Sequence, residues 1–247
     1  MPNPIESLKT PPVIEATAGF VFLKPLDESE LQAFEKYLKE IPNTTFSIHN
    51  RVQQTFTLGG ENSSKSESLK ILEGFILSDT QKRWKLLIQR RGVFLNHPAD
   101  PHPGWEKISE TLLTLISQLP KEITSRKCKE LVSRYINRIT APSPFKFASY
   151  FKIRPFIESE DELAVGNLSM SFVLKNSTGG RGVIRLAQES ADPGISVTFN
   201  LDIECAIEFP SNHMTDESTR NHLFSLRAFK NDIFMRIVTD EYLRACE

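Results

Sequence analysis

The chain has 247 residues, of which 25% are charged and 39% hydrophobic, with 30 Lys and Arg against 31 Asp and Glu. These values are typical of a globular protein. No apolar run approaches the ~20 residues of a membrane-spanning helix. The nearly equal numbers of acidic and basic residues argue against a protein whose main role is to bind nucleic acid through positive charge. Three Cys without a C-x-x-C pair argue against a disulfide framework or zinc ribbon, and the N-terminus lacks the apolar core of a secretion signal, so we expect a cytoplasmic protein.

The first half of the chain alternates strand and helix patterns. Apolar residues at spacings of two or of three and four predict strand 13–23, helix 30–41, strands 45–58, 71–77 and 84–95, helix 105–119 and strand 129–139. The polar, Ser-rich residues 59–68 are expected to form a loop. The resulting order, β-α-β-β-β-α-β, predicts an α+β fold with a mainly antiparallel sheet and a ferredoxin-like tendency.

The second half is richer in strands. Alternating residues predict strands 163–175, 181–188 and 194–209, with a hairpin turn at 176–180 and a last helix ending near Ile237. The Pro-containing segment 140–157 is the expected junction. We therefore expect an N-terminal α+β half, 1–141, and a β-rich half, 142–247, either as two packed halves or as one compact domain.

Residues with metal-ligand or nucleophile chemistry are few. His97, Asp100 and His102 lie in a Pro-rich loop, but their spacing matches no standard ligand pattern. A hydrolase built on these three residues is a weaker hypothesis than a rigid surface loop. Cys128 stands between two lysines, which favours the thiolate, but no His partner is evident and a solvated strand entry is the preferred interpretation. Cys205 fits the packing pattern of a strand.

Two further motifs have a structural interpretation. Residues 179–182, Gly-Gly-Arg-Gly, precede a strand rather than a helix and therefore indicate a turn rather than a phosphate loop. The acidic run 158–162 is expected to be a solvated connector, with divalent-ion binding as the alternative. We predict no metal site and no cofactor.

Positive charge is concentrated in one part of the chain. Residues 82–138 contain 12 Lys and Arg against 5 acids, so the near-neutral total hides an uneven distribution. If these side chains converge, they form a basic surface for phosphate or an acidic partner; otherwise they point in several directions. The residues selected for binding a ligand or partner are Arg90, Arg91, Lys127, Arg134 and Arg138.

The segment RYINRI, 134–139, has a strand period. Arg134 and Arg138 share one face, where they can pair with carboxylates of a neighbouring strand, and a polar structural network is favoured over ligand binding. Asn137 falls on the opposite, apolar face and needs buried hydrogen-bond partners.

Several segments together resemble the pattern of a known family. These segments are RYINRI (134–139), PVIEA (12–16), GVFLN (92–96) followed by Trp105, the region of Tyr150, and LRAFKNDIF (226–234). The chain resembles a sporadically distributed family of uncharacterised prokaryotic proteins of about this length. The resemblance implies an α+β fold, transfers no established catalytic residues, and suggests genes linked to defence or mobile elements.

Two functional hypotheses follow. The first is a non-catalytic cytoplasmic protein that binds a protein partner or a second copy of itself, through a β edge or the C-terminal helix. The alternative is a protein that binds or processes nucleic acid, RNA above all, through the basic region 82–138. A pI near 6.5 and the lack of a Gly/aromatic RNA-binding signature argue against that alternative.

Overall fold

The computed structural model describes residues 12–40, 46–58, 67–79, 83–98, 103–142, 146–153, 168–177, 179–192, 195–209 and 217–246. Its strands are β1 (Val13–Phe22), β2 (Phe46–Leu58), β3 (Glu67–Asp79), β4 (Lys85–Gln89), β5 (Gly92–Pro98), β6 (Cys128–Pro142), β7 (Ser169–Lys175), β8 (Arg181–Asp192) and β9 (Ser196–Glu208). Its helices are α1 (Glu28–Glu40), α2 (Trp105–Ser117), α3 (Lys121–Thr124), α4 (Phe147–Tyr150), α5 (Glu217–Ile237) and α6 (Asp240–Ala245).

All described strands belong to one nine-stranded sheet in the order β2-β3-β4-β5-β1-β6-β9-β8-β7. Every neighbouring pair is antiparallel. The expected α+β class with a mainly antiparallel sheet is therefore confirmed, whereas a ferredoxin-like strand order is not. Residues 130–142 of β6 pair with residues 196–208 of β9, so one continuous sheet includes strands of both expected halves.

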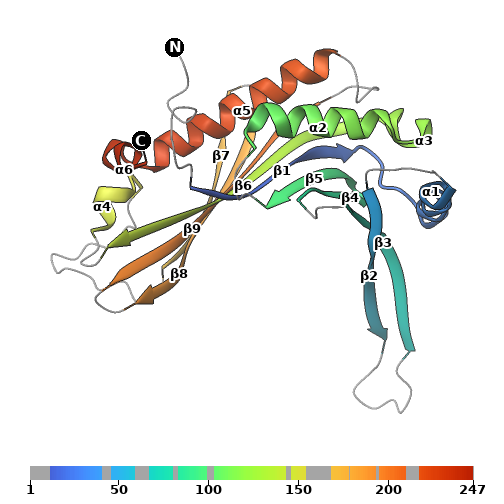
Figure 1. Cartoon of the computed structure of the whole chain (residues 1–247), viewed down its shortest axis with the longest axis horizontal. Coiled ribbons are helices and arrows are strands. Elements are labelled where there is room, and N and C mark those ends of the chain that lie inside the picture. The colour runs from blue at the N-terminus through green and yellow to red at the C-terminus, as the bar shows by residue number, and fades with distance from the viewer. Residues whose placement is uncertain are drawn as a thin grey trace.

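The long helices lie on one face of this curved sheet (Figure 1). α2 packs against β1 and β5, α5 packs against β6 and β9, and α1 contacts β3 at the other side of the molecule. The opposite face carries no helix among the described residues, and this helix-free face is the concave side of the sheet in Figure 1.

The core lies between the sheet and the helices. Ala16, Ala18 and Phe20 of β1 are fully buried, as the two-residue spacing predicted. α2 adds Ile108, Leu112 and Leu115 as its buried stripe, and α5 adds Leu223, Leu226, Ile233 and Ile237. Burial of these apolar side chains is the main favourable contribution to folding.

Some predicted boundaries are wrong. The single strand expected over 84–95 is a hairpin, because the chain reverses at Arg90 and Arg91 and β4 pairs with β5. The strand expected over 71–77 is longer, since Glu67 and Ser68 of the expected loop already pair with β2. Residues 59–66, 99–102 and 154–167 lie outside the described residues, and these ranges include Asp100, His102 and the acidic run 158–162. No helix in the described part of the chain is long and apolar enough to cross a membrane.

Candidate binding groove

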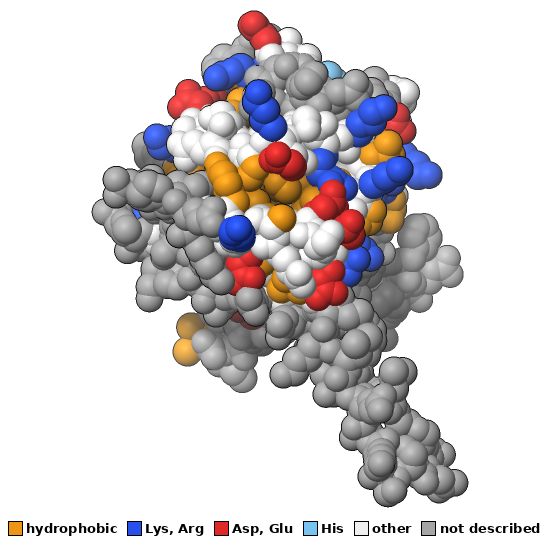
Figure 2. All heavy atoms as spheres, turned by 90° about the vertical axis from the view of Figure 1, so that its right-hand side faces the viewer, with side chains coloured by type: hydrophobic (Ala, Val, Ile, Leu, Met, Phe, Trp, Pro, Cys, Tyr) orange, Lys and Arg blue, Asp and Glu red, His pale blue; other side chains and the backbone are white. Residues whose placement is uncertain are grey.

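A hollow of about 330 Å³ lies between α1 and the short helix α3. We call it the α1–α3 groove. Figure 2 looks at this end of the molecule and shows an apolar area with acidic and basic side chains around it. Its apolar lining consists of Leu26, Ala33, Phe34, Tyr37, Pro120 and Ile123. Leu26, Phe34 and Ile123 are buried at its base, whereas Ala33 is exposed at its wall.

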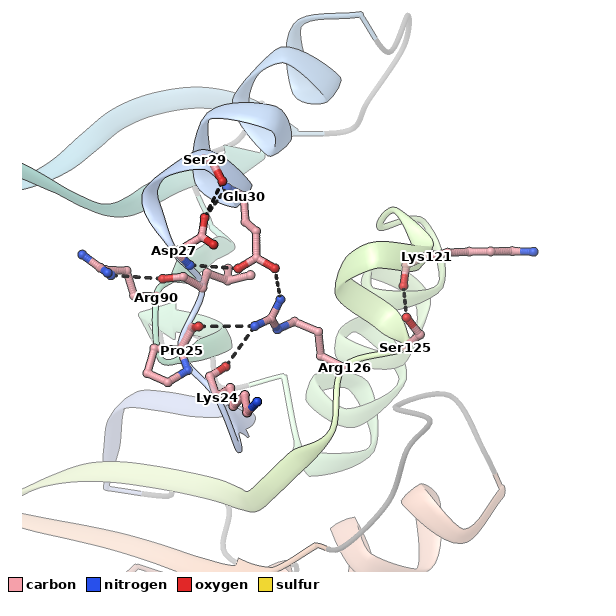
Figure 3. A network of polar contacts seen from close by, with 10 residues as sticks. Lys24, Pro25, Asp27, Ser29, Glu30, Arg90, Lys121, Ser125 and Arg126 are labelled. Atoms are coloured by element: carbon pink, nitrogen blue, oxygen red, sulfur yellow. Dashed lines mark hydrogen bonds and ion pairs between the residues drawn. The ribbon is translucent and has the colours of Figure 1, made fainter.

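Arg126 ties the two walls of the groove together. Its guanidinium forms an ion pair with Glu30 of α1 and donates hydrogen bonds to the carbonyl oxygens of Lys24 (3.2 Å) and Pro25 (3.3 Å). It also lies 5.5 Å from the centre of the Phe22 ring. In Figure 3 the side chain reaches from the segment after α3 to the start of α1. Arg126 therefore links the two walls through several contacts, and the hydroxyl of Tyr37 on α1 adds a hydrogen bond to the carbonyl oxygen of Gln118 at 3.2 Å.

The start of α1 is a reciprocal capping box. A carboxylate oxygen of Asp27 accepts the backbone N–H of Glu30 at 2.8 Å, and a carboxylate oxygen of Glu30 accepts the backbone N–H of Asp27 at 2.8 Å. The hydroxyl of Ser29 donates to Asp27 (2.7 Å) and holds the pKa of that carboxyl below its usual value. Because the second oxygen of Glu30 pairs with Arg126, the cap and the groove share one residue.

Three of the five residues selected from the sequence gather near this groove. Arg90 donates from Nε to the carbonyl of Leu26 at 3.1 Å. The carbonyls of Arg91 and Lys127 accept the backbone N–H groups of Phe22 and Leu23, each at 2.8 Å. The segment 22–26 is therefore flanked by Arg91 on one side and Lys127 on the other, and both of these side chains are exposed.

Arg134 and Arg138 lie elsewhere, on the helix-free face of the sheet. Arg134 donates two hydrogen bonds of 2.9 Å to Asp202 of β9, which also pairs with Arg185 at 3.1 Å. Arg138 donates two hydrogen bonds, of 3.1 and 3.0 Å, to Glu189. Hydrogen bonding to Asp202 raises the pKa of Arg134 above its usual value. Convergence of all five residues on one surface is thus not observed.

The helix-free face contains its own hollow of about 470 Å³. Val21, Leu87, Phe94 and Val132 give it an apolar centre, and charged residues stand around that centre: Glu15, Glu130, Arg134, Arg181 and Glu204. Asn96 of β5 bonds to the neighbouring strand β1 here, since its side-chain amide donates to the side chains of Glu15 (2.9 Å) and Thr17 (3.0 Å). The charges within this hollow are of both signs, so it does not form a basic surface.

The residues considered for chemistry are mostly buried. Lys127 and Lys129 are exposed where β6 begins, in agreement with the expected solvated strand entry. The thiol of Cys128 between them is buried, and burial raises its pKa to about 12 rather than favouring the thiolate. Burial also raises the pKa of Cys205 to about 12, in agreement with its expected packing role. His97 faces the core beside Trp84, with ring centres 4.3 Å apart, and burial lowers its pKa. No group of three His, Cys, Asp or Glu suited to a metal ion occurs within the described ranges.

The RYINRI segment lies in β6, near the middle of the sheet. Tyr135 and Asn137 are buried on the helix side, and the Asn137 amide donates to the carbonyl of Leu201 at 3.0 Å. The motif residues therefore have structural partners, as the strand period suggested. No family model matches the chain, and comparison with curated proteins gives no match.

Proposed function

We propose that this chain is a non-catalytic, cytoplasmic binding protein that holds an apolar side chain of a protein partner in the α1–α3 groove. The observation that supports this proposal is an apolar hollow of about 330 Å³ with walls tied together by Arg126. A preformed apolar hollow favours an aromatic or aliphatic anchor residue of the partner, because binding removes the apolar surface of both the groove and that side chain from water.

The charges at the groove indicate what should accompany the anchor. Arg126 is neutralised by Glu30, and Glu122 is exposed at the mouth. A partner segment with an apolar anchor next to a Lys or Arg therefore fits best. The buried, protonated thiols of Cys128 and Cys205 support the non-catalytic part of the proposal, because a thiol with a pKa of about 12 is a poor nucleophile at neutral pH.

A matched pair of substitutions on α1 tests the groove. Ala33→Trp fills the hollow from an exposed position, whereas Gln32→Trp places the same side chain on the neighbouring exposed position outside it. Peptides selected from a displayed random library on the wild-type protein are expected to contain an apolar anchor and a basic neighbour. Their affinity, measured by fluorescence anisotropy, should fall about tenfold or more with Ala33→Trp and stay unchanged with Gln32→Trp.

Two results would contradict the groove proposal. One is a set of selected peptides that bind the Ala33→Trp protein as well as the wild type. The other is a set that shares no apolar anchor. In either case the partner surface lies elsewhere, and the helix-free face becomes the next site to test.

Nucleic-acid binding is the second candidate function. It is favoured by the gathering of Lys24, Arg90, Arg91 and Lys127 around the end of β1. Affinity for a generic single-stranded RNA should then fall steeply with salt, because phosphate contacts release counterions. Arg91→Ala with Lys127→Ala should reduce the slope of log affinity against log salt by about 1.4, since each phosphate contact on a single strand contributes about 0.7. Lack of retention on RNA at low salt would remove this candidate.

A further inference from the structure

β7 is the outermost of the described strands at one side of the sheet, and its hydrogen bonds with β8 determine which of its backbone groups point outward. Leu168 accepts from the N–H of Gln188 (2.8 Å), and Asn176 donates to the carbonyl of Gly180 (2.9 Å), so both residues point their backbone groups toward β8. The register between them is regular, and directions alternate along a strand. The N–H and C=O groups of Ser169, Ser171 and Val173 therefore point away from β8, and no described strand pairs with them.

The sequence of β7 lacks the usual protection of an edge strand. Ser169 to Leu174 contain no charge, no Pro and no Gly, and only Lys175 at the end is charged. Natural edge strands commonly carry central charges, prolines or bulges that prevent pairing with another chain. Val173 is 56% exposed on the helix-free side. This edge is thus suited to pairing rather than protected against it.

The apolar side chains on the helix side of β7 are only partly covered by the core. Met170, Phe172 and Leu174 stand opposite the buried β8 residues Leu186, Ile184 and Gly182, and they pack against the core cluster. All three are nevertheless only half-buried. A partner strand that presents apolar residues on this side and small residues on the other would complete their burial.

We propose that the missing strand is β7 of a second copy of this chain, paired antiparallel around a two-fold axis at Phe172. Such a register places Phe172 opposite its own copy, Met170 opposite Leu174, and Ser169 opposite Lys175. No two like charges face each other, and both helix layers lie on the same side of one continuous sheet. Self-pairing of this kind is isologous, so a single strand provides both complementary surfaces.

The proposed dimer is independent of the α1–α3 groove. α1 packs on β3, which lies near the other end of the strand order. A two-fold axis at β7 therefore leaves both grooves accessible at the outer ends of the dimer. Failure of the groove proposal would not affect the dimer, and failure of the dimer would not affect the groove.

Sedimentation equilibrium of the full chain tests the proposal. The wild-type protein is expected at twice its monomer mass of 28.1 kDa. Ser171→Pro removes an outward N–H without touching the β8 ladder and should give a monomer, whereas Ser171→Ala keeps the N–H and should stay dimeric. Val173→Glu, at an exposed position beside the two-fold axis, should also give a monomer. This variant tests the dimer if the Ser171→Pro protein fails to fold.

Amide hydrogen exchange of the wild-type protein gives a second, substitution-free readout. The N–H groups of Ser169 and Ser171 should be protected at concentrations where the dimer forms and should exchange rapidly in the monomeric Val173→Glu protein. A monomeric wild-type chain would overturn the proposal, and so would a dimer that persists in the folded Ser171→Pro and Val173→Glu variants. Protected outer amides in a monomer would overturn it as well, because another segment of the same chain would then cover the edge.

Discussion

Arg126 connects two segments that are about a hundred residues apart in the chain. Its guanidinium pairs with Glu30 and donates to two carbonyl oxygens, and its side chain is only 17% exposed. Arg138 provides the contrast, since its pair with Glu189 is 47% and 38% exposed. Exposed pairs contribute little to stability because water screens both charges. Arg126 should therefore matter more for stability than Arg138, although both form ion pairs.

Arg126→Ala should lower the free energy of unfolding by about 2 kcal/mol, because several charge-assisted hydrogen bonds are lost at a largely shielded position. The loss stays below that of a fully buried pair, since Glu30 is 39% exposed. Urea denaturation measures the difference. Arg138→Ala is the matched control and should change the free energy of unfolding by less than about 1 kcal/mol. Equal effects of the two variants would refute the larger stabilising role of Arg126.

His97 should make stability depend on pH. Burial lowers its pKa in the folded protein, whereas the unfolded chain should have the usual value of about 6.5. Below that pH the unfolded state binds the proton more readily, so stability is full above about 6.5 and decreases as the pH falls toward the lower folded value. His97→Phe, which keeps a ring beside Trp84, should flatten this decrease in denaturation curves between pH 7 and 5. If the dependence of stability on pH is the same in the His97→Phe protein, His97 is not its cause.

At the level of the elements, a bulge shapes the hairpin of β2 and β3. The register shifts between Val52 and Gln53, so Glu73 is the extra residue on β3 beside Gly74. β4 pairs only with residues 74–78 of β3, and the rest of the hairpin therefore extends beyond β4, as Figure 1 shows. The bulge marks where this extension begins.

Gly74 is required at the bulge for two reasons. Its φ is +153°, and an added Cβ would lie 2.1 Å from the carbonyl oxygen of Ile88. Gly74→Ala should therefore destabilise the protein by several kcal/mol, because a backbone atom must move. Gly179→Ala is the control: φ is +83° there, but nothing lies within 4 Å of the added Cβ, so the cost should be only about 1 kcal/mol. Thermal denaturation followed by circular dichroism compares the two; similar losses would mean that the clash at Gly74 is relieved cheaply.

For the whole molecule, the long pairing of β6 with β9 has the largest consequence. Strands from 1–141 and from 142–247 share one sheet and one core cluster. Unfolding of either half would expose the apolar face of the other and leave a long ladder unpaired. The two halves are thus expected to unfold as one cooperative unit.

Coincident denaturation curves would verify this cooperativity. Trp84 and Trp105 both lie in the first half, so tryptophan fluorescence follows that half, whereas far-ultraviolet circular dichroism follows the whole chain. The two urea midpoints should agree, as in a two-state transition. Midpoints that differ would indicate that residues 1–141 and 142–247 are separable domains.

Several parts of the fold could be predicted from local patterns. The two-residue alternation of β1 and the helical stripes of α2 and α5 predict their buried faces, because burial follows the geometry of a single element. The capping box of Asp27 and Glu30 could also have been found, since its D-x-x-E spacing is local. The turn at Arg90 and Arg91 is not predicted because neither residue is a usual turn former and the apolar runs 86–88 and 93–95 on its two sides resemble one continuous strand.

The sequence by itself determined the class of the fold, the buried faces of β1, β9, α2 and α5 and the pairing tendency of Arg134 and Arg138, because these follow from period and charge within short segments. Tertiary structure decided that Arg90, Arg91 and Lys127 meet around residues 22–26 while Arg134 and Arg138 do not join them. It also decided that Arg126 joins the two walls of the α1–α3 groove and that β7 is an outer strand among the described ones. These contacts join residues far apart in the chain, and only the order in which strands pair brings such residues together.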